Sequence, residues 1–145
     1  MKGRILKMQS VLFLCTGNSC RSQLAEAIVA NDCKSEWQAF SAGTLPTGFV
    51  NPVALQVLKE IGIEHQGRSK SIQEYYGQTF DHVITVCDDA EANCPVWLGH
   101  GKKVHIGFRD PARFSGTAEQ MLQEFREVRD QIRKEIIDYL LTVEE

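Results

Sequence analysis

Long hydrophobic runs and a strong excess of one charge are both missing from this sequence. No run approaches the roughly 18 apolar residues needed to span a membrane. The apolar run at 11–14 follows a basic start but is too short for the core of an export signal. The net charge of -3 provides no general basic field to neutralise nucleic-acid phosphates. We therefore expect a cytoplasmic protein that binds neither membranes nor nucleic acids.

Internal repeats, low-complexity tracts and recognisable linkers are also absent. Apolar residues make up 43% of the chain and charged residues 24%, values that exclude a disordered or fibrous protein. A chain of 145 residues is long enough to bury a substantial core. The sequence thus predicts one domain over residues 1–145, which we expect to be monomeric.

Cysteines, in contrast, are frequent: Cys15, Cys20, Cys33, Cys87 and Cys94. Because their number is odd and we expect a reducing compartment, a simple framework of structural disulfides does not fit. Cysteines at such spacings are more often catalytic, redox-active or metal-binding. The four histidines show no spacing to these cysteines that is typical of a zinc site, so we expect no metal.

Strands and helices are predicted to alternate along the chain. An almost continuous apolar run at 10–15 is typical of a strand buried on both faces of a parallel sheet. Further strands are predicted at 37–41, 82–87 and 103–106, with helices at 21–30, from Asn51 and Pro52 onwards, and after Thr117. This alternation implies right-handed βαβ crossovers and an α/β fold, a parallel sheet with helices on both faces.

Two of the predicted helices show their buried faces in the sequence. In the helix opened by Asn51, the expected apolar stripe consists of Ala54, Leu55, Leu58 and Ile61. Thr117 can cap the last helix together with Gln120. Apolar residues recur along that helix in steps of three and four, at Met121, Phe125, Val128, Ile132, Ile136 and Leu140.

The segment CTGNSCRS joins the first predicted strand to the first helix. Successive backbone N–H groups at a helix start can converge on a tetrahedral oxyanion, and Gly17 allows the tight curvature that this requires. Arg21 offers a planar fork of donors for two oxygens of such an ion. The same positive surroundings favour the thiolate form of Cys15, the expected nucleophile. The predicted anion-binding loop comprises Thr16, Gly17, Asn18, Ser19, Cys20, Arg21 and Ser22.

This arrangement of strand, Cys-x5-Arg-Ser loop and helix resembles the low-molecular-weight protein tyrosine phosphatase family. In that family a later Asp-Pro supplies a general acid, and the matching pair here is Asp110-Pro111. The sequence CTGNSCRSQLAEA, residues 15–27, is still more similar to the thioredoxin-coupled arsenate reductases built on that fold. The resemblance extends over nearly the whole chain, and it implies a four-stranded parallel sheet flanked by helices.

A second pair of cysteines, Cys87 and Cys94, matches the pair used by those reductases, whereas a phosphatase needs neither. The resemblance implies that the Cys15 thiolate attacks arsenate and that Asp110 protonates the leaving oxygen. Cys87 would then attack the Cys15 sulfur and release arsenite. Cys94 would next attack Cys87, leaving a Cys87–Cys94 disulfide for thioredoxin to reduce. The resemblance implies no bound cofactor.

Geometry constrains this second pair of cysteines. Residues seven apart on an intact helix are separated by roughly 10.5 Å, whereas disulfide-bonded Cα atoms rarely lie beyond about 7 Å. If residues 88–93 are helical in the reduced protein, they must bend or unwind when Cys87 and Cys94 join. We therefore predict a segment that rearranges with redox state. Cys20 is expected to pack within the loop, and we predict no catalytic role for Cys33.

Supporting roles can be assigned to several polar residues near the loop. Asn18 and Ser22 are expected to hold the loop and to hydrogen-bond the Cys15 sulfur. Asp110 also has a purely structural interpretation, as the residue that opens the turn before Pro111.

Some family members bind potassium near the loop through residues matching Asn18, Glu26 and Ser41 together with an acidic side chain. The residue that aligns with this acid here is Lys70, which makes a potassium site doubtful. We hypothesise that the Lys70 ammonium replaces the cation and pairs with Glu26. The alternative is that Lys70 lies solvated in a loop, as lysines usually do.

Two other functions are compatible with the sequence. A protein tyrosine phosphatase would use the same loop without the relay, although residues 112–114 are Ala-Arg-Phe where that branch commonly has a tyrosine pair. A thiol redox sensor or metal-binding module would use the cysteines without turning over an oxyanion, and Arg21 and Asp110 would then have no purpose. The resemblance favours an arsenate reductase, with weak phosphatase activity as a side reaction.

Overall fold

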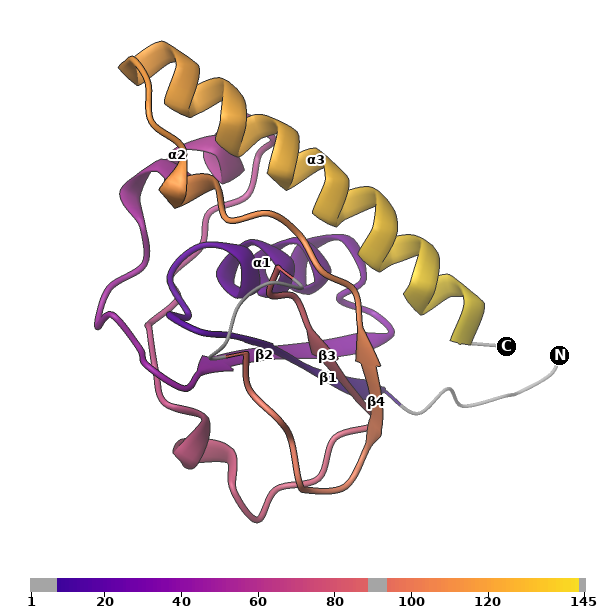
Figure 1. Cartoon of the computed structure of the whole chain (residues 1–145). Helices are drawn as coiled ribbons and strands as arrows, with labels where there is room; N and C mark the ends of the chain where they lie inside the picture. Colours follow the sequence, from indigo (N-terminus) through magenta and orange to yellow (C-terminus); the bar gives the residue numbers. More distant parts are fainter. Residues whose placement is uncertain (1–7, 89–93, 144–145) are drawn as a thin grey trace, which may run out of the picture.

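Four parallel strands lie at the centre of the structure, a computed structural model that describes residues 8–88 and 94–143 (Figure 1). The strands are β1 (Gln9–Cys15), β2 (Trp37–Gly43), β3 (His82–Thr85) and β4 (Lys102–His105). Their order across the sheet is β2-β1-β3-β4, so β1 has a parallel neighbour on each side. The predicted four-stranded parallel sheet is confirmed.

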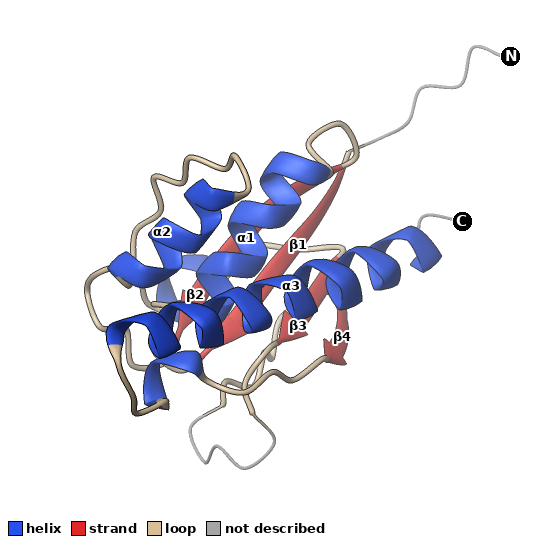
Figure 2. Cartoon of the chain, turned by 90° about the horizontal axis from the view of Figure 1, so that it is seen from above, coloured by secondary structure: helices blue, strands red, loops and turns tan. Residues whose placement is uncertain are grey.

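Helices cover the two faces of this sheet unequally. The α-helices α1 (Arg21–Asp32), α2 (Pro52–Glu60) and α3 (Ala118–Val143) all lie over one face (Figures 1 and 2). The other face is covered by the 3-10 helix η1 (Ile72–Tyr75) and by loops. A second 3-10 turn, η2 (Pro111–Arg113), precedes α3. The predicted α/β class is confirmed. The helix on the second face is the short 3-10 helix η1, whereas α1, α2 and α3 lie over the first face.

β1 is buried on both faces, as its continuous apolar sequence predicts. Val11 and Phe13 pack into the cluster beneath α1 and α3, whereas Leu12 and Leu14 pack on the opposite side of the sheet. This alternation follows from the two-residue period of a strand. The opposite side is closed by aromatic rings in edge contact, namely Phe40, Tyr75, Phe80 and Trp97.

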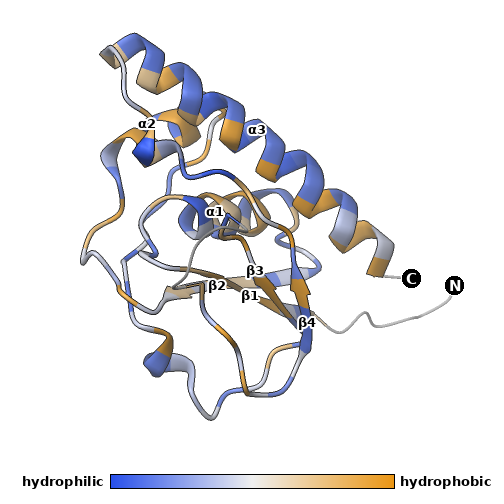
Figure 3. Ribbon diagram, viewed as in Figure 1, coloured by the Kyte–Doolittle hydropathy of each residue, from blue (hydrophilic) through white to orange (hydrophobic). Residues whose placement is uncertain are grey.

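The long helix α3 buries one apolar stripe and begins at its predicted cap. Thr117 Oγ1 accepts a hydrogen bond from the Gln120 N–H at 3.1 Å, and Gln120 Oε1 accepts one from the Thr117 N–H at 2.9 Å. This capping box satisfies donors that the first helical turn cannot. Figure 3 shows apolar residues recurring along α3. The buried members of the predicted stripe are Phe125, Val128, Ile132, Ile136 and Leu140, and Met121 is half-buried.

Several element boundaries differ from the predicted ones for identifiable reasons. β2 continues beyond Ser41 because Ala42 and Gly43 still pair with the end of β1. β3 ends at Thr85 instead of Cys87 because its pairing with both β1 and β4 stops there. β4 begins and ends one residue earlier than predicted, and α1 is longer than predicted at its carboxyl end.

The stripe predicted for α2 is correct only in part. Ala54 and Leu58 are buried, but Leu55 and Ile61 are half-buried. Val57 faces the core in their place, and Ile61 lies beyond the helix as its C-cap residue.

None of the helices in the described residues is both long and apolar enough to cross a membrane. Within 8–88 and 94–143, no three His, Cys, Asp or Glu side chains gather in a way that could hold a metal ion. The redox-linked rearrangement predicted for residues 88–93 concerns a segment of which 89–93 lie outside the described residues.

Candidate active site

The loop between β1 and α1 has its carbonyl groups bonded to the protein around it. The carbonyl oxygens of Thr16, Gly17 and Ser19 accept hydrogen bonds of 2.9 to 3.1 Å from backbone N–H groups of the segment 45–51. In a trans peptide unit the C=O and the following N–H point in opposite directions. The N–H groups that follow these carbonyls therefore point away from the segment 45–51, an arrangement that suits an oxyanion site.

Gly43 and Asn18 give the loop its shape. A Cβ atom at Gly43 would overlap the carbonyl oxygen of Thr16, so only glycine lets the end of β2 pass directly beside the loop. Asn18 has a φ of 48°, the only positive φ of a non-glycine residue in the described part of the chain. The Asn18 side chain is held in place by donating to Ser22 Oγ at 2.8 Å and to Ser41 Oγ at 2.9 Å.

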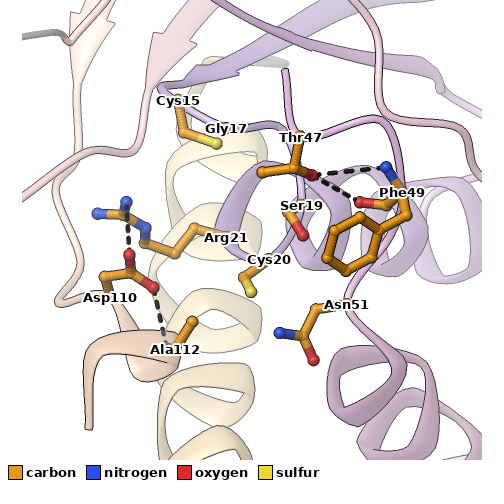
Figure 4. A pocket seen from close by; sticks show the side chains of 10 residues that line it. All are labelled: Cys15, Gly17, Ser19, Cys20, Arg21, Thr47, Phe49, Asn51, Asp110 and Ala112. Atoms are coloured by element: carbon orange, nitrogen blue, oxygen red, sulfur yellow. Dashed lines mark hydrogen bonds and ion pairs between the residues drawn. The ribbon is translucent and has the colours of Figure 1, made fainter. Parts of the chain in front are cut away.

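Cys15 ends β1, and its side chain lies at the loop beside Arg21 and Asp110 (Figure 4). The side chain is buried, and its Sγ lies 2.9 Å from Ser22 Oγ. Either atom can donate while Cys15 is a thiol, but a thiolate can only accept, so in that form the Ser22 hydroxyl donates its proton to the sulfur. A hydroxyl that donates to sulfur stabilises the thiolate form.

Arg21 and Asp110 face each other beside this sulfur (Figure 4). Arg21 Nη2 lies 3.6 Å from Asp110 Oδ2, and Arg21 Nη1 donates to the Phe108 carbonyl oxygen at 3.1 Å. The Asp110 side chain is 23% exposed, so water and substrate can reach it. Its Oδ1 accepts from the Ala112 N–H at 3.0 Å and caps η2. Asp110 therefore opens a turn and also presents a carboxyl oxygen at the site.

A cavity of about 210 Å³ lies against these residues (Figure 4). The predicted site residues that line it are Cys15, Gly17, Ser19, Cys20, Arg21 and Asp110. Its described lining therefore combines a nucleophile, a fixed cation and a carboxyl group. Such a set can attack a tetrahedral oxyanion, hold its charge and exchange a proton with a leaving oxygen.

Cys20 and Cys33 are both buried. Burial raises the pKa of Cys20 to about 12, and the negative charges of Asp110 and Cys15 act in the same direction. Cys20 is therefore a neutral thiol at physiological pH and a poor nucleophile. Cys33 follows α1 as its C-cap residue.

Cys87 follows β3 at the same edge of the sheet as Cys15. Leu14 is aligned with Thr85 in the register of β1 and β3, so Cys15 is aligned with Val86, the residue before Cys87. Cys87 is fully buried in the cluster that also contains Cys15, and Cys94 is half-buried against that cluster. The structure thus brings the three predicted redox thiols to one side of the sheet, although the described lining of the cavity includes only Cys15 among them.

Lys70 is buried beside Glu26. Its Nζ lies 3.7 Å from Glu26 Oε1 and donates to the Arg68 carbonyl oxygen at 3.0 Å. Ser41 Oγ donates to the same carboxylate at 2.5 Å and lies 3.5 Å from Lys70 Nζ. Burial lowers the pKa of Lys70, whereas Glu26 opposes this shift. The predicted pairing is found, and the alternative of a solvated lysine is wrong.

Residues 10–145 match the model of the family described as low molecular weight phosphotyrosine protein phosphatase. The chain belongs to this family. The strand, the Cys-x5-Arg-Ser loop and the helix that follows it, on which the resemblance rests, are all present in that order.

Two relatives of this family member carry the name arsenate reductase. The one from Halalkalibacterium halodurans is 44% identical over 127 residues, which cover 87% of this chain and 91% of that protein. The one from Bacillus subtilis is 40% identical over 133 residues, which cover 91% of this chain and 95% of that protein. Both matches extend over most of the phosphatase-family domain.

Solved structures of arsenate reductases and of phosphatases both resemble this chain. A structure described as an arsenate reductase in the phosphate binding state has a TM-score of 0.74 at 26% identity, covering 93% of this chain and 98% of that one. A thioredoxin-dependent arsenate reductase from Corynebacterium glutamicum has a TM-score of 0.65 at 26% identity, covering 93% of this chain and 63% of that one.

One wall of the phosphatase-family site was missed in the sequence. Thr47, Phe49 and Ala112 line the cavity together with Asn51, for which the sequence predicts only a helix cap. Asn51 does cap α2, because its side chain accepts from the Val53 N–H at 2.8 Å. No local pattern shows that the turn-rich segment before Asn51 pairs with the loop, because that contact is made by backbone groups.

Proposed function

We propose that this protein is an arsenate reductase that works through Cys15, Cys87 and Cys94. The observation that carries the proposal is that Cys87, two residues beyond the end of β3, is buried in the same cluster as Cys15, which ends the adjacent parallel strand β1. Thr85 pairs with Leu14, so the segment that leads from β3 to Cys87 begins beside the end of β1. A disulfide needs its two Cα atoms within about 7 Å, and burial in one cluster beside these two strand ends brings the thiols into the same region. The names of the two relatives support the same reaction.

The first step is attack of the Cys15 thiolate on the arsenic atom of arsenate. The N–H groups of the loop and the Arg21 guanidinium hold the oxyanion, and the Ser22 hydroxyl orients the sulfur. Protonated Asp110 gives its proton to the departing oxygen, which leaves as water. The product is a covalent Cys15–As(V) adduct, so arsenic has not yet changed its oxidation state.

The redox step is attack of the Cys87 thiolate on the Cys15 sulfur. The new S–S bond forms as the S–As bond breaks, and the electron pair of the broken bond stays on arsenic. As(V) is thereby reduced to As(III), which leaves as arsenite, and the two thiols are oxidised to the Cys15–Cys87 disulfide.

A second exchange moves the disulfide away from the site. The Cys94 thiolate attacks the Cys87 sulfur, expels Cys15 as a thiolate and leaves a Cys87–Cys94 disulfide. Because Cys94 is half-buried while Cys15 is buried, this exchange carries the disulfide towards the surface. A dithiol protein of the thioredoxin class can then reduce it, as the description of the Corynebacterium glutamicum enzyme indicates for that protein. A cycle that begins from reduced thiols fits the cytoplasm.

The Cys94→Ser variant isolates the first two steps and tests the proposal. Without any external reductant it should release about one arsenite per protein, as expected from the stoichiometry of thiol–disulfide exchange. It should also accumulate the Cys15–Cys87 disulfide, which mass spectrometry of digested protein detects. Cys33→Ala is the matched control and should retain the full cycle. Arsenite release without that disulfide would contradict the relay.

A second candidate function is suggested by the family and by the cavity. Cys15, Arg21 and Asp110 are also the groups that a phosphatase needs. Because phosphate and arsenate have similar shapes, weak hydrolysis of para-nitrophenyl phosphate is expected beside reduction. A wild-type protein that hydrolyses this ester but forms no arsenite would be a phosphatase.

We further propose that Lys70 takes the place of the potassium ion bound by some family members. Its ammonium lies beside Glu26 and Ser41, the residues that match potassium ligands. One positive charge thus already offsets the Glu26 carboxylate. A second cation at the same place would be repelled by Lys70.

A further inference from the structure

Gln23 is a fully buried amide that connects the active-site loop to the segment 65–70. It lies in the first turn of α1, with Nε2 3.1 Å from the Asn18 carbonyl oxygen, 3.1 Å from Asn18 Oδ1 and 3.0 Å from the Arg68 carbonyl oxygen. All three are acceptors, so the NH2 group of Gln23 must lie on this side. Gln23 Oε1 is consequently directed at another neighbour, His65.

His65 is the donor that completes this connection. Its Nε2 lies 2.8 Å from Gln23 Oε1, and because an amide oxygen can only accept, the imidazole carries a proton on Nε2. Burial lowers the pKa of His65; the charge of Glu26 opposes this shift and that of Lys70 adds to it. The ring is therefore neutral at physiological pH, with Nε2 as its donor.

Gly67 is independent evidence that the fold makes room for this contact. A Cβ atom at Gly67 would overlap both His65 Nε2 and Gln23 Oε1. Gly67 is not among the glycines with a positive φ, so its backbone conformation does not require glycine. Glycine is required because the His65–Gln23 pair occupies the space that a Cβ atom would need.

Asn18 is the loop residue that Gln23 contacts. Its φ of 48° lies in the left-handed region, which asparagine adopts more readily than most residues with a side chain, and neighbouring groups fix it there. Gln23 bonds its carbonyl and side-chain oxygens, and the Lys70 N–H donates to the same Oδ1 at 2.9 Å. With that oxygen fixed, Asn18 Nδ2 is directed to Ser22, whose hydroxyl faces the Cys15 sulfur.

We propose that His65 and Gln23 are positioning residues for the oxyanion loop. His65 holds the Gln23 amide, and Gln23 holds Asn18 in the conformation that orients the loop N–H groups and directs Ser22 to Cys15. Neither His65 nor Gln23 is among the residues that line the cavity. The proposal rests on the oxyanion site of the proposed function but not on the cysteine relay, because the loop must be held for a reductase and a phosphatase alike.

The His65→Ala variant tests this role without requiring turnover. Two quantities are measured: the dissociation constant for inorganic phosphate, and the rate of iodoacetamide alkylation at Cys15 as a function of pH, quantified by mass spectrometry. Loss of one buried hydrogen bond should weaken phosphate binding about fivefold to tenfold. The alkylation profile should move to higher pH because the donors around the sulfur lose their alignment. His65→Gln, whose amide can donate to the same oxygen, should restore most of both.

His82→Ala is the matched control. His82 is buried and forms a side-chain hydrogen bond between Nδ1 and Tyr139 OH at 3.1 Å, but it begins β3 at the far end of the sheet from the loop. This variant should lose thermal stability yet bind phosphate and react at Cys15 as the wild type does. Gly67→Ala keeps every hydrogen-bonding group but displaces His65 and Gln23, so it should weaken phosphate binding even if His65→Ala does not fold.

Two results would overturn the proposal in distinguishable ways. If His65→Ala and Gly67→Ala match the wild type in phosphate binding and in the alkylation profile, the positioning role is wrong while the oxyanion site stands. If wild-type protein binds no phosphate and phosphate does not slow alkylation of Cys15, the oxyanion site itself is wrong and both proposals fall.

Discussion

Ser22 and Arg21, which both lie at the Cys15 site, each have a second bond that fixes them. Ser22 accepts from Asn18 while facing the sulfur, and Arg21 donates to a backbone carbonyl while facing Asp110. Groups held in this way lose little freedom when an anion arrives. The chemistry proposed for the site therefore depends on single contacts that single substitutions can remove.

Asp110→Asn should separate turnover from anion binding. Asparagine can still cap η2 through its oxygen but cannot transfer a proton, so arsenate turnover should fall about 10²–10⁴-fold. Removing a negative charge 3.6 Å from Arg21 should leave phosphate binding at least as tight. Turnover and phosphate dissociation constants, measured beside the exposed control Asp138→Asn, check this. A similar loss in both quantities would contradict the role of general acid.

Lys70 leads to a prediction about salts. The wild-type protein should turn over arsenate at equal rates in potassium and sodium chloride of the same ionic strength, because the ammonium already offsets Glu26. Lys70→Ala should be slower and should regain part of its rate in potassium, whereas Lys134→Ala, at an exposed lysine, should do neither. Strong activation of the wild type by potassium over sodium would contradict the hypothesis that Lys70 replaces the cation.

At the scale of elements, the unit β1, loop and α1 could be predicted because each part has a local signal. A continuous apolar run gives the strand, and the Cys-x5-Arg-Ser spacing gives the loop. The end of β3 at Thr85 has no such signal, because it depends on where pairing with His105 stops. The wall formed by Thr47 and Phe49 was missed for the same reason. Contacts between backbone groups that are distant in sequence do not depend on residue type, so the sequence does not show them.

The capping box of α3 is a testable element-scale feature. Thr117→Ala removes the hydroxyl that accepts from the Gln120 N–H and should lower the free energy of unfolding by about 1 kcal/mol. Thr142→Ala, at an exposed position in the last turn of the same helix, should change it by less than about 0.5 kcal/mol. Urea denaturation of both variants measures the difference. Equal losses would show that the cap contributes nothing specific.

The whole molecule places its proposed chemistry at one end of the sheet. The nucleophile lies at the carboxyl ends of the strands, where ligands bind in parallel α/β sheets. The other end of β3 holds His82, whose ring contacts Trp37 and Tyr139. The fold class could be predicted because it follows from alternating strands and helices. The network of Gln23 and His65 could not, since it joins residues 42 positions apart through side-chain orientation.

His82 should make global stability depend on pH. Burial lowers its pKa, nearby Lys102 acts in the same direction, and Asp81 opposes both. The unfolded chain therefore binds this proton more readily than the folded protein does. Stability is complete above the unfolded value of about 6.5 and falls as the pH drops from there through the folded pKa. His82→Gln should reduce this dependence of stability on pH, as measured by urea denaturation. The reduction should be partial, because the pKa of His65 is lowered too. An unchanged slope would refute the assignment.

We infer that the site of Cys15 performs reduction because Cys87 and Cys94 carry the oxidation away. The most direct measurement is arsenate-dependent NADPH oxidation in the presence of thioredoxin and thioredoxin reductase. Wild-type protein should support it, and Cys15→Ser, Cys87→Ser and Cys94→Ser should each abolish steady turnover. Cys87→Ser and Cys94→Ser should retain any hydrolysis of para-nitrophenyl phosphate. Steady arsenate reduction that survives in Cys87→Ser or Cys94→Ser would contradict the account.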